Sequence, residues 1–134
     1  MSLLLFAAAL AAAPAGSDGV LGLWKTQTRN GIVEISRCGA SVCGRLVTSD
    51  GLKADPNLKD VNNANPGLRG RPLKGLPILS GFKADGAVWN GGKIYNAEDG
   101  KTYSARLTPS GNQLQVRGCI FVPLCKTQTW TRIR

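Results

Sequence analysis

Apolar and polar residues alternate with a period of two along much of the chain. In residues 101–108, for example, Tyr103, Ala105 and Leu107 fall on one face, and the residues between them are polar. Successive side chains of a strand point to opposite faces, so this pattern predicts half-buried β-strands. No segment after the first fifteen residues shows a sustained helical period. The pattern predicts nine strands, at residues 22–29, 31–37, 42–48, 75–82, 86–90, 92–97, 101–108, 112–118 and 126–133.

Residues that favour tight turns separate these strands. Asn-Gly and Asp-Gly pairs suit hairpins because both of their residues tolerate a positive φ. Such sequences occur at Asn30-Gly31, Asp50-Gly51, Asp85-Gly86, Asn90-Gly91-Gly92 and Asp99-Gly100. Consecutive hairpins form an antiparallel meander, and closure of the meander removes its exposed edges. We therefore expect an all-β protein, a small antiparallel up-and-down β-barrel of about eight to nine strands with one long loop.

The long loop covers residues 49–74 and is rich in Asp, Asn, Pro and Gly. Loops of this length in a compact domain are usually functional or ordered by their own turns. We expect this one to be ordered at a rim of the barrel, with a helical turn that starts at Pro66 after Asn65. A calcium site is not expected, because counting from Asp60 places Arg71 at the twelfth position, where an EF-hand needs Glu.

Two roles are open for the loop cations Arg69 and Arg71. Arginine offers planar, paired donors that suit a carboxylate or phosphate of a ligand. The same cations could instead pair with Asp55 or Asp60 and hold the loop against the barrel. We favour this second role.

The start of the chain predicts export. Residues 3–13 are apolar and uncharged, and Ala13-Pro14-Ala15 fits a signal-peptidase site. The run is too short to span a bilayer, which takes about 20 apolar residues. We expect a signal peptide at residues 1–15, a single β-barrel domain at residues 16–134, no transmembrane segment, and a periplasmic or secreted protein.

Charge and composition narrow the possible functions. The 134-residue chain has a formal net charge of +9 and contains no histidine. Histidine is the usual proton-transfer group and the commonest metal ligand. The eight acidic residues form no evident catalytic pair, so we expect no enzymatic activity, no metal and no cofactor. Outside the cytoplasm, the available polyanions are envelope components rather than nucleic acid, and we favour the alternative that the basic residues form a solvated surface.

Four cysteines form two closely spaced pairs, Cys38 with Cys43 and Cys119 with Cys125. These spacings differ from those of zinc ribbons and redox motifs. Four cysteines allow three disulfide connectivities, and the sequence alone does not choose among them. We favour the two local pairs as structural disulfides in an oxidising compartment.

Gly22-Leu23-Trp24 near the start of the barrel and Trp130-Thr131-Arg132 near its end resemble the lipocalin and calycin signature. The resemblance implies structural roles for Gly22, Trp24, Trp130 and Arg132, with the Arg132 guanidinium lying on the Trp24 ring. The alternative is that Trp130, rather than Trp24, is the tryptophan packed inside.

Motifs along nearly the whole chain resemble the exported bacterial domain-of-unknown-function family 2147. That resemblance implies a lipocalin-like barrel and export, and it implies no known reaction. The motifs are Gly22-Leu23-Trp24, Cys38 to Gly44, Leu68 to Gly75, Trp89 to Asn96, Asp99 to Tyr103, Val116 to Cys119 and Gln128 to Arg132.

We expect an exported, non-enzymatic binding module that takes a small apolar or amphipathic ligand in its barrel. The candidate ligand-binding residues are two loop cations and three aromatic residues, namely Arg69, Arg71, Trp89, Tyr95 and Tyr103. The alternative is a cell-envelope interaction protein that docks on an anionic glycolipid or polysaccharide. A barrel interior lined for a ligand favours the first hypothesis, and a packed interior with a basic face favours the second.

Overall fold

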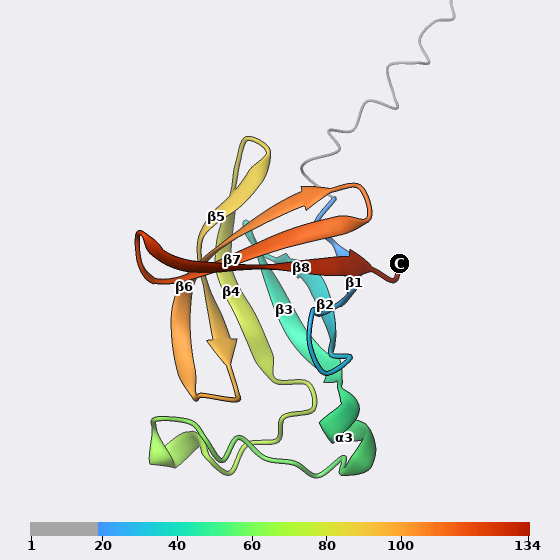
Figure 1. Ribbon diagram of the computed structural model, residues 1–134, viewed down its shortest axis with the longest axis vertical. Helices are drawn as coiled ribbons and strands as arrows, with labels where there is room; N and C mark the ends of the chain where they lie inside the picture. Colours follow the sequence, from blue (N-terminus) through green and yellow to red (C-terminus); the bar gives the residue numbers. More distant parts are fainter. Residues whose placement is uncertain (1–18) are drawn as a thin grey trace, which may run out of the picture.

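Eight antiparallel strands pair with their neighbours in chain order, and the last strand closes on the first. The computed structural model describes residues 19–134, so the predicted signal peptide lies outside the described residues. Figure 1 shows the barrel with one long loop at its lower end. The elements are β1 (Gly22–Lys25), β2 (Ile32–Cys38), β3 (Ser41–Thr48), α3 (Asp50–Ala54), η2 (Pro66–Leu68), β4 (Pro77–Asp85), β5 (Val88–Asn96), β6 (Lys101–Ser110), β7 (Gln113–Phe121) and β8 (Leu124–Arg132).

The eight strands confirm the expected barrel of about eight to nine strands, but one predicted division between strands is wrong. The sequence pattern predicts separate strands at residues 86–90 and 92–97, whereas the structure has a single strand, β5. Asn90-Gly91-Gly92 forms a bulge rather than a hairpin, because the pairing of β5 with β6 shifts between Trp89 and Gly92. A bulge accommodates an extra residue without ending the strand, and glycine is common there.

Buried side chains fill the interior of the barrel. Leu107 pairs with Val116, and Leu114 pairs with Trp130, so these four side chains point inward while their sequence neighbours point outward. Burial of each large apolar side chain stabilises the fold by about 1.5–3 kcal/mol. The core consists of Val20, Trp24, Val33, Ile35, Val42, Leu79, Phe82, Trp89, Ala105, Leu107, Leu114, Val116 and Trp130.

The predicted contact between the two ends of the barrel is confirmed. The Arg132 guanidinium lies 4.3 Å from the centre of the Trp24 ring. It also donates hydrogen bonds to the carbonyl oxygens of Leu21, at 2.9 Å, and Gly19. The indole Nε1 of Trp24 donates to the carbonyl oxygen of Val20 at 2.9 Å. Trp24 and Trp130 are both core residues, so the alternative that Trp130 is packed inside instead of Trp24 is wrong.

Both favoured disulfides are present. Cys38–Cys43 joins β2 to β3 near their hairpin, with Cα atoms 5.9 Å apart. Cys119–Cys125 joins directly paired residues of β7 and β8, with Cα atoms 4.0 Å apart. Each disulfide therefore links the two strands of one hairpin.

The long loop is ordered by short helices and by turns of its own. The predicted helical turn is confirmed as η2, and the Asn65 side chain accepts a hydrogen bond from the Gly67 N–H at 2.9 Å. The helix α3 is not predicted from the sequence, because five residues are too few for a helical period. It begins after Ser49, whose hydroxyl accepts a hydrogen bond from the Leu52 N–H at 3.2 Å. Among the described residues, no helix has the length and apolar character needed to cross a membrane.

Candidate functional site

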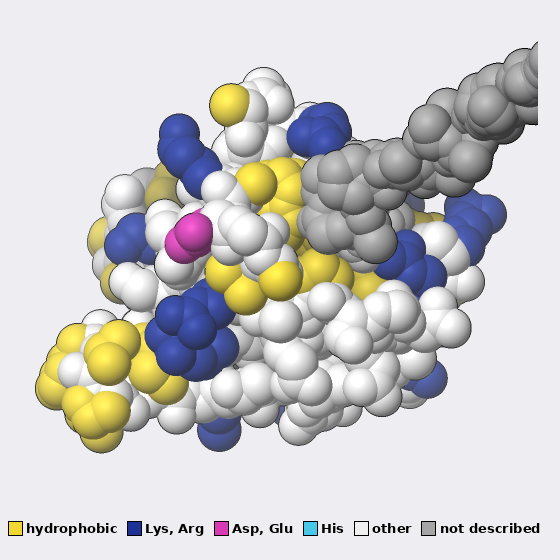
Figure 2. Space-filling view, turned by 90° about the horizontal axis from the view of Figure 1, so that it is seen from above, with side chains coloured by type: hydrophobic (Ala, Val, Ile, Leu, Met, Phe, Trp, Pro, Cys, Tyr) yellow, Lys and Arg dark blue, Asp and Glu magenta, His cyan; other side chains and the backbone are white. Residues whose placement is uncertain are grey.

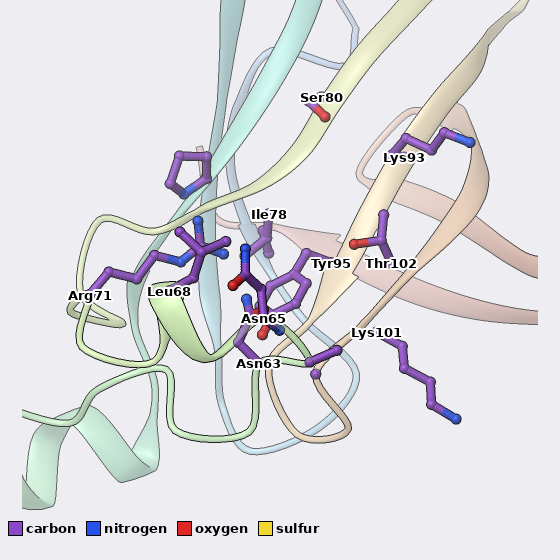
Figure 3. A pocket seen from close by; sticks show the side chains of 13 residues that line it. Asn63, Asn65, Leu68, Arg71, Ile78, Ser80, Lys93, Tyr95, Lys101 and Thr102 are labelled. Carbon is purple, nitrogen blue, oxygen red and sulfur yellow. The ribbon is translucent and has the colours of Figure 1, made fainter.

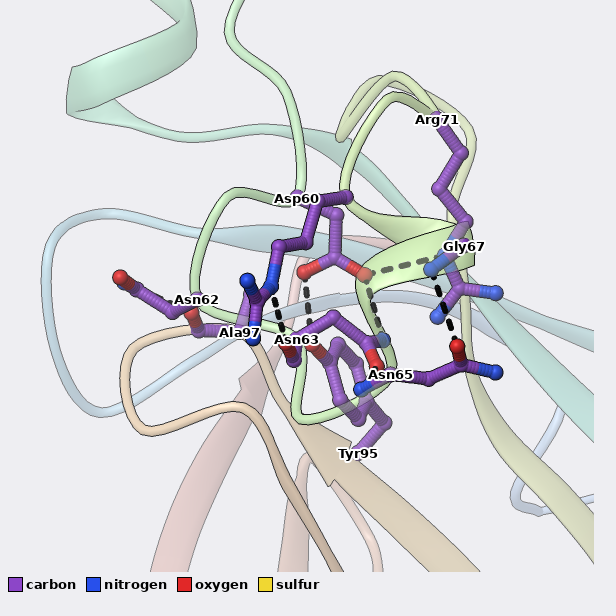
Figure 4. A network of polar contacts seen from close by, with 9 residues as sticks. Asp60, Asn62, Asn63, Asn65, Gly67, Arg71, Tyr95 and Ala97 are labelled. Atoms are coloured by element: carbon purple, nitrogen blue, oxygen red, sulfur yellow. Dashed lines mark hydrogen bonds and ion pairs between the residues drawn. The ribbon is translucent and has the colours of Figure 1, made fainter.

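The side chain of Asp60 is buried at the centre of a polar network that joins the long loop to β5. Its Oδ1 accepts a hydrogen bond from the Tyr95 hydroxyl at 2.6 Å. Its Oδ2 accepts from Asn63 Nδ2 at 2.9 Å and from Arg71 Nε at 3.0 Å (Figure 4). The Arg71 guanidinium also lies 5.4 Å from the centre of the Tyr95 ring. One carboxylate therefore connects two limbs of the loop to the barrel.

The backbone of the loop brings the members of this network together. Lys59 and Pro72 form an isolated antiparallel bridge, which places the two limbs of the loop side by side. The N–H of Asp60 donates to the carbonyl oxygen of Arg71 at 3.0 Å. The predicted ion pair between Arg71 and Asp60 is thus confirmed, and it joins the two limbs of the loop. The hydrogen bond from Tyr95 to Asp60 connects them to β5 of the barrel.

The network shifts the pKa values of its members in opposite directions. Burial raises the pKa of Asp60, but its three hydrogen bonds and the charge of Arg71 outweigh that effect, so the pKa lies below its ordinary value of 3.8. Burial and the hydrogen bond to Asp60 raise the pKa of the Tyr95 hydroxyl above its ordinary value of 10.0. At neutral pH the network therefore consists of an ionised Asp60 and a neutral Tyr95.

Asp60→Asn is expected to lower the free energy of unfolding at neutral pH by about 1–3 kcal/mol, because Arg71 loses its charged acceptor. The pKa of Asp60 is lower in the folded protein, so the ionised carboxylate stabilises the fold above pH 3.8 and loses this effect as the pH falls through the folded pKa. Urea denaturation at neutral and acidic pH should show the difference between the two proteins narrowing in acid. An unchanged difference would contradict the assigned role of Asp60.

A pocket of about 550 Å³ lies between the loop and the strands β4, β5 and β6 (Figure 3). Ser80 pairs with Lys93, and Tyr95 pairs with Thr102. These residues alternate with inward-facing neighbours such as Leu79, so the pocket lies on the outer face of the barrel. We call it the loop pocket; its lining residues are Asn63, Ala64, Asn65, Leu68, Arg71, Pro77, Ile78, Ser80, Lys93, Tyr95, Gly100, Lys101 and Thr102.

The loop pocket combines apolar and cationic side chains. Leu68, Pro77 and Ile78 contribute apolar surface, whereas Lys93 and Lys101 contribute positive charge. No Asp, Glu, His or Cys is among the described residues that line it. Across residues 19–134 there is also no group of three or more such side chains that could hold a metal ion. The lining therefore suits binding of a molecule with an apolar part and an anionic part.

The five candidate ligand-binding residues do not form one site. Arg71 and Tyr95 both line the loop pocket. Arg69 is exposed and donates from Nε to the Asn63 carbonyl oxygen at 2.8 Å, rather than to an acidic side chain. Trp89 is a core residue, and Tyr103 donates its hydroxyl hydrogen bond to Asp99. Of the sequence-based set, Arg69, Trp89 and Tyr103 do not line the loop pocket.

Several residues of the loop pocket are not among the sequence-based candidates. The sequence pattern predicts that Lys93 and Thr102 point to the outer face of the barrel, because each is a polar residue that alternates with apolar residues of a predicted strand. It does not predict that they lie in a pocket. Ile78 gives no such signal, since its apolar side chain is typical of the core. The contribution of Asn63 depends on how the long loop folds, and local patterns do not predict this.

Comparison with known proteins supports the resemblance seen in the sequence. The sequence model of a family described as "Uncharacterized protein conserved in bacteria (DUF2147)" matches residues 22–132. Among solved structures, protein HP1028 from the human pathogen Helicobacter pylori, described as belonging to the lipocalin family, matches with a TM-score of 0.77 and 28% sequence identity. That match covers 86% of this chain and 83% of the Helicobacter chain. No curated protein matches this sequence.

Proposed function

This chain belongs to the bacterial family DUF2147, and from that membership, its lipocalin-like barrel and the loop pocket we propose that it is an extracytoplasmic binding protein for a small amphipathic ligand. The observation that carries the proposal is the mixed lining of the loop pocket. Apolar contacts from Leu68 and Ile78 would hold the body of the ligand, and Arg71, Lys93 and Lys101 would attract its anionic group.

The proposal places the ligand outside the barrel rather than in its interior. The sequence pattern, by contrast, predicts a site in the interior. Three tryptophan side chains, Trp24, Trp89 and Trp130, are buried in the core together with Phe82. Because protein interiors are closely packed, these large rings favour a structural core over a ligand cavity at their positions.

We further propose that the protein binds without catalysing a reaction. General acid–base chemistry needs a titratable group within hydrogen-bond reach of the substrate. The carboxylate of Asp60 is the acidic group of the adjoining network, and Tyr95, Asn63 and Arg71 already occupy both of its oxygens. A location outside the cytoplasm is supported by the two disulfides, which persist in oxidising compartments.

Thr102→Trp tests the site, because a large side chain on the exposed outer face would fill the loop pocket without entering the core. Anilinonaphthalene sulfonate, an amphipathic anion, serves as the probe in an NMR titration. In the unmodified protein we expect shifts centred on the amides of residues 63–65 and 101–102. In Thr102→Trp we expect binding at these amides to weaken by at least about tenfold, which corresponds to roughly 1.4 kcal/mol.

Thr131→Trp is the matched control, since Thr131 is also exposed and lies on β8, away from the loop pocket. It should leave the shifts at residues 63–65 unchanged. Native mass spectrometry of both variants and the unmodified protein would then show whether a natural ligand is retained. Equal probe binding at these amides in both variants would rule out the loop pocket as the binding site.

A further inference from the structure

The turn between β7 and β8 exposes a group of apolar side chains. We call residues 120–124 the hairpin tip; its exposed apolar residues are Ile120, Phe121, Val122 and Leu124, which are between 54% and 70% exposed. The disulfide Cys119–Cys125 joins the two strands directly below it. In Figure 1 this turn projects at the left of the barrel, and Figure 2 shows hydrophobic side chains gathered at the same end, with Lys or Arg side chains beside them. Contiguous exposed apolar surface of this kind marks an interaction site in many proteins.

Two arginines face each other on the outer side of the same strands. Arg106 of β6 pairs directly with Arg117 of β7, while their neighbours Leu107 and Val116 point into the core. Like charges directly opposite each other in a sheet are destabilising. Within residues 19–134, no acidic side chain forms an ion pair with either arginine. The outer face therefore holds two adjacent cations whose repulsion a bound anion would relieve.

The arginine pair also has unused hydrogen-bond donors. The Nε atoms of Arg106 and Arg117 are both buried, and neither has a hydrogen-bond partner among the described residues. Buried polar atoms without a partner are uncommon, and each one needs an explanation. A planar guanidinium donates well to the oxygens of a phosphate group, so an anionic oxygen ligand suits this pair of arginines.

A second pocket connects the arginine pair to the hairpin tip. It has a volume of about 240 Å³. Its lining includes three cationic residues, Lys93, Arg106 and Arg117, and two residues of the hairpin tip, Phe121 and Val122. It shares only Lys93 with the loop pocket, so its role does not depend on the ligand proposed there.

We propose that the hairpin tip and the arginine pair form a docking site for the surface of a membrane that contains anionic phospholipids. The pocket binds a lipid phosphate through Arg106 and Arg117. The side chains of the hairpin tip enter the boundary between head groups and acyl chains, as apolar side chains of interfacial proteins do. The overall charge of +9 draws the protein towards an anionic surface before these contacts form.

The combination of charge and apolar surface favours a membrane over other occupants. A free phosphate would use the arginine pair but would leave the hairpin tip exposed to water. A second copy of this chain would bring a second pair of arginines to the interface, and the repulsion between the pairs would oppose association. An anionic bilayer offers both the phosphate and the apolar layer next to it.

Vesicle co-sedimentation tests the proposal. The unmodified protein should bind vesicles of phosphatidylcholine mixed equally with phosphatidylglycerol and should leave vesicles of phosphatidylcholine alone unbound. Arg106→Gln with Arg117→Gln should weaken binding by about 25-fold, since each cation near an anionic surface contributes about fivefold. Phe121→Ser with Val122→Ser should weaken it by at least about tenfold, since two apolar side chains no longer enter the bilayer.

Lys25→Gln with Lys53→Gln is the control for net charge. Both lysines are exposed, and they lie on β1 and α3, on the other side of the molecule from the hairpin tip (Figure 1). This variant loses the same two charges, but we expect its binding to weaken by less than about threefold, because salt screens distant charges. All substituted positions lie on the outer surface of the barrel, in the hairpin tip or on α3, and urea midpoints should confirm that each variant is folded.

Three results would overturn the proposal. The first is equal weakening by the lysine and arginine variants, which would mean a general charge effect. The second is NMR shifts at Arg106 and Arg117 with inorganic phosphate but no binding to the mixed vesicles, which would mean a site for a soluble anion. The third is a dimer that Phe121→Ser converts to a monomer, without vesicle binding, which would mean that the hairpin tip pairs with a second copy of the chain.

Discussion

Trp24→Ala is expected to lower the free energy of unfolding by about 3–5 kcal/mol, the range for removal of a buried aromatic side chain. Trp24 is fully buried, and its ring lies between the core and the Arg132 guanidinium. Alanine would leave a cavity in the core and would remove the surface on which Arg132 lies. It would also remove the indole donor to the Val20 carbonyl oxygen.

Urea denaturation measures this effect as a shift of the midpoint at an unchanged slope. Arg69→Ala serves as the comparison, because Arg69 is exposed and an exposed polar contact contributes about 0–1 kcal/mol. The Trp24 variant should be the less stable of the two by a wide margin. Similar midpoints for the two variants would show that Trp24 does not support the core as described.

Gly100→Ala is expected to detach the long loop from the turn between β5 and β6. Gly100 has a φ of +72°, and a Cβ atom there would lie 1.7 Å from the Asn62 carbonyl oxygen. The positive φ belongs to the backbone of Gly100, and the clashing oxygen belongs to the backbone of Asn62. A side-chain movement therefore cannot relieve the clash. The Ala64 N–H also donates to the Gly100 carbonyl oxygen, at 3.4 Å. We therefore expect faster hydrogen exchange at residues 62–64 and a loss of stability of more than about 2 kcal/mol.

Gly111→Ala is the matched control. Gly111 also has a positive φ, +61°, but no atom lies within 4 Å of the position of an added Cβ. This variant should show only the cost of the left-handed conformation, about 1–2 kcal/mol. Its hydrogen exchange at residues 62–64 should match that of the unmodified protein. If the two glycine variants behave alike, the close approach of Asn62 to Gly100 does not hold the loop.

The barrel was predictable because its strands carry a strong local signal. Alternation in residues 101–108 identifies β6, and the placement of Trp24 and Arg132 at opposite ends of the chain identifies the closure. The same reasoning fails at Asn90-Gly91-Gly92, because glycine with a positive φ serves both a hairpin and a bulge. It also ends β7 too early, since the apolar side chains at the end of that strand are exposed and break the alternation.

The candidate site was predictable only in part, because its contacts join distant segments. Arg71 and Asp60 lie in the same loop, so their pairing could be proposed from the sequence. Tyr95 lies 35 positions from Asp60, and no local pattern connects them. Trp89 and Tyr103 show a second reason why the sequence does not identify the site. An aromatic side chain suits a core as well as a binding site.

The seam between β1 and β8 also determines when the barrel can form. Within the described part of the chain two residue pairs join these strands, Trp24 with Arg132 and Lys25 with Thr131. The hydrogen bond from Arg132 to Leu21 spans 111 positions of the chain. Contacts this distant in sequence form late, because the chain between them must first be ordered. The barrel is therefore expected to stay open during folding until β8 is in place, and loss of Arg132 would remove both its pairing with Trp24 and its hydrogen bond to Leu21.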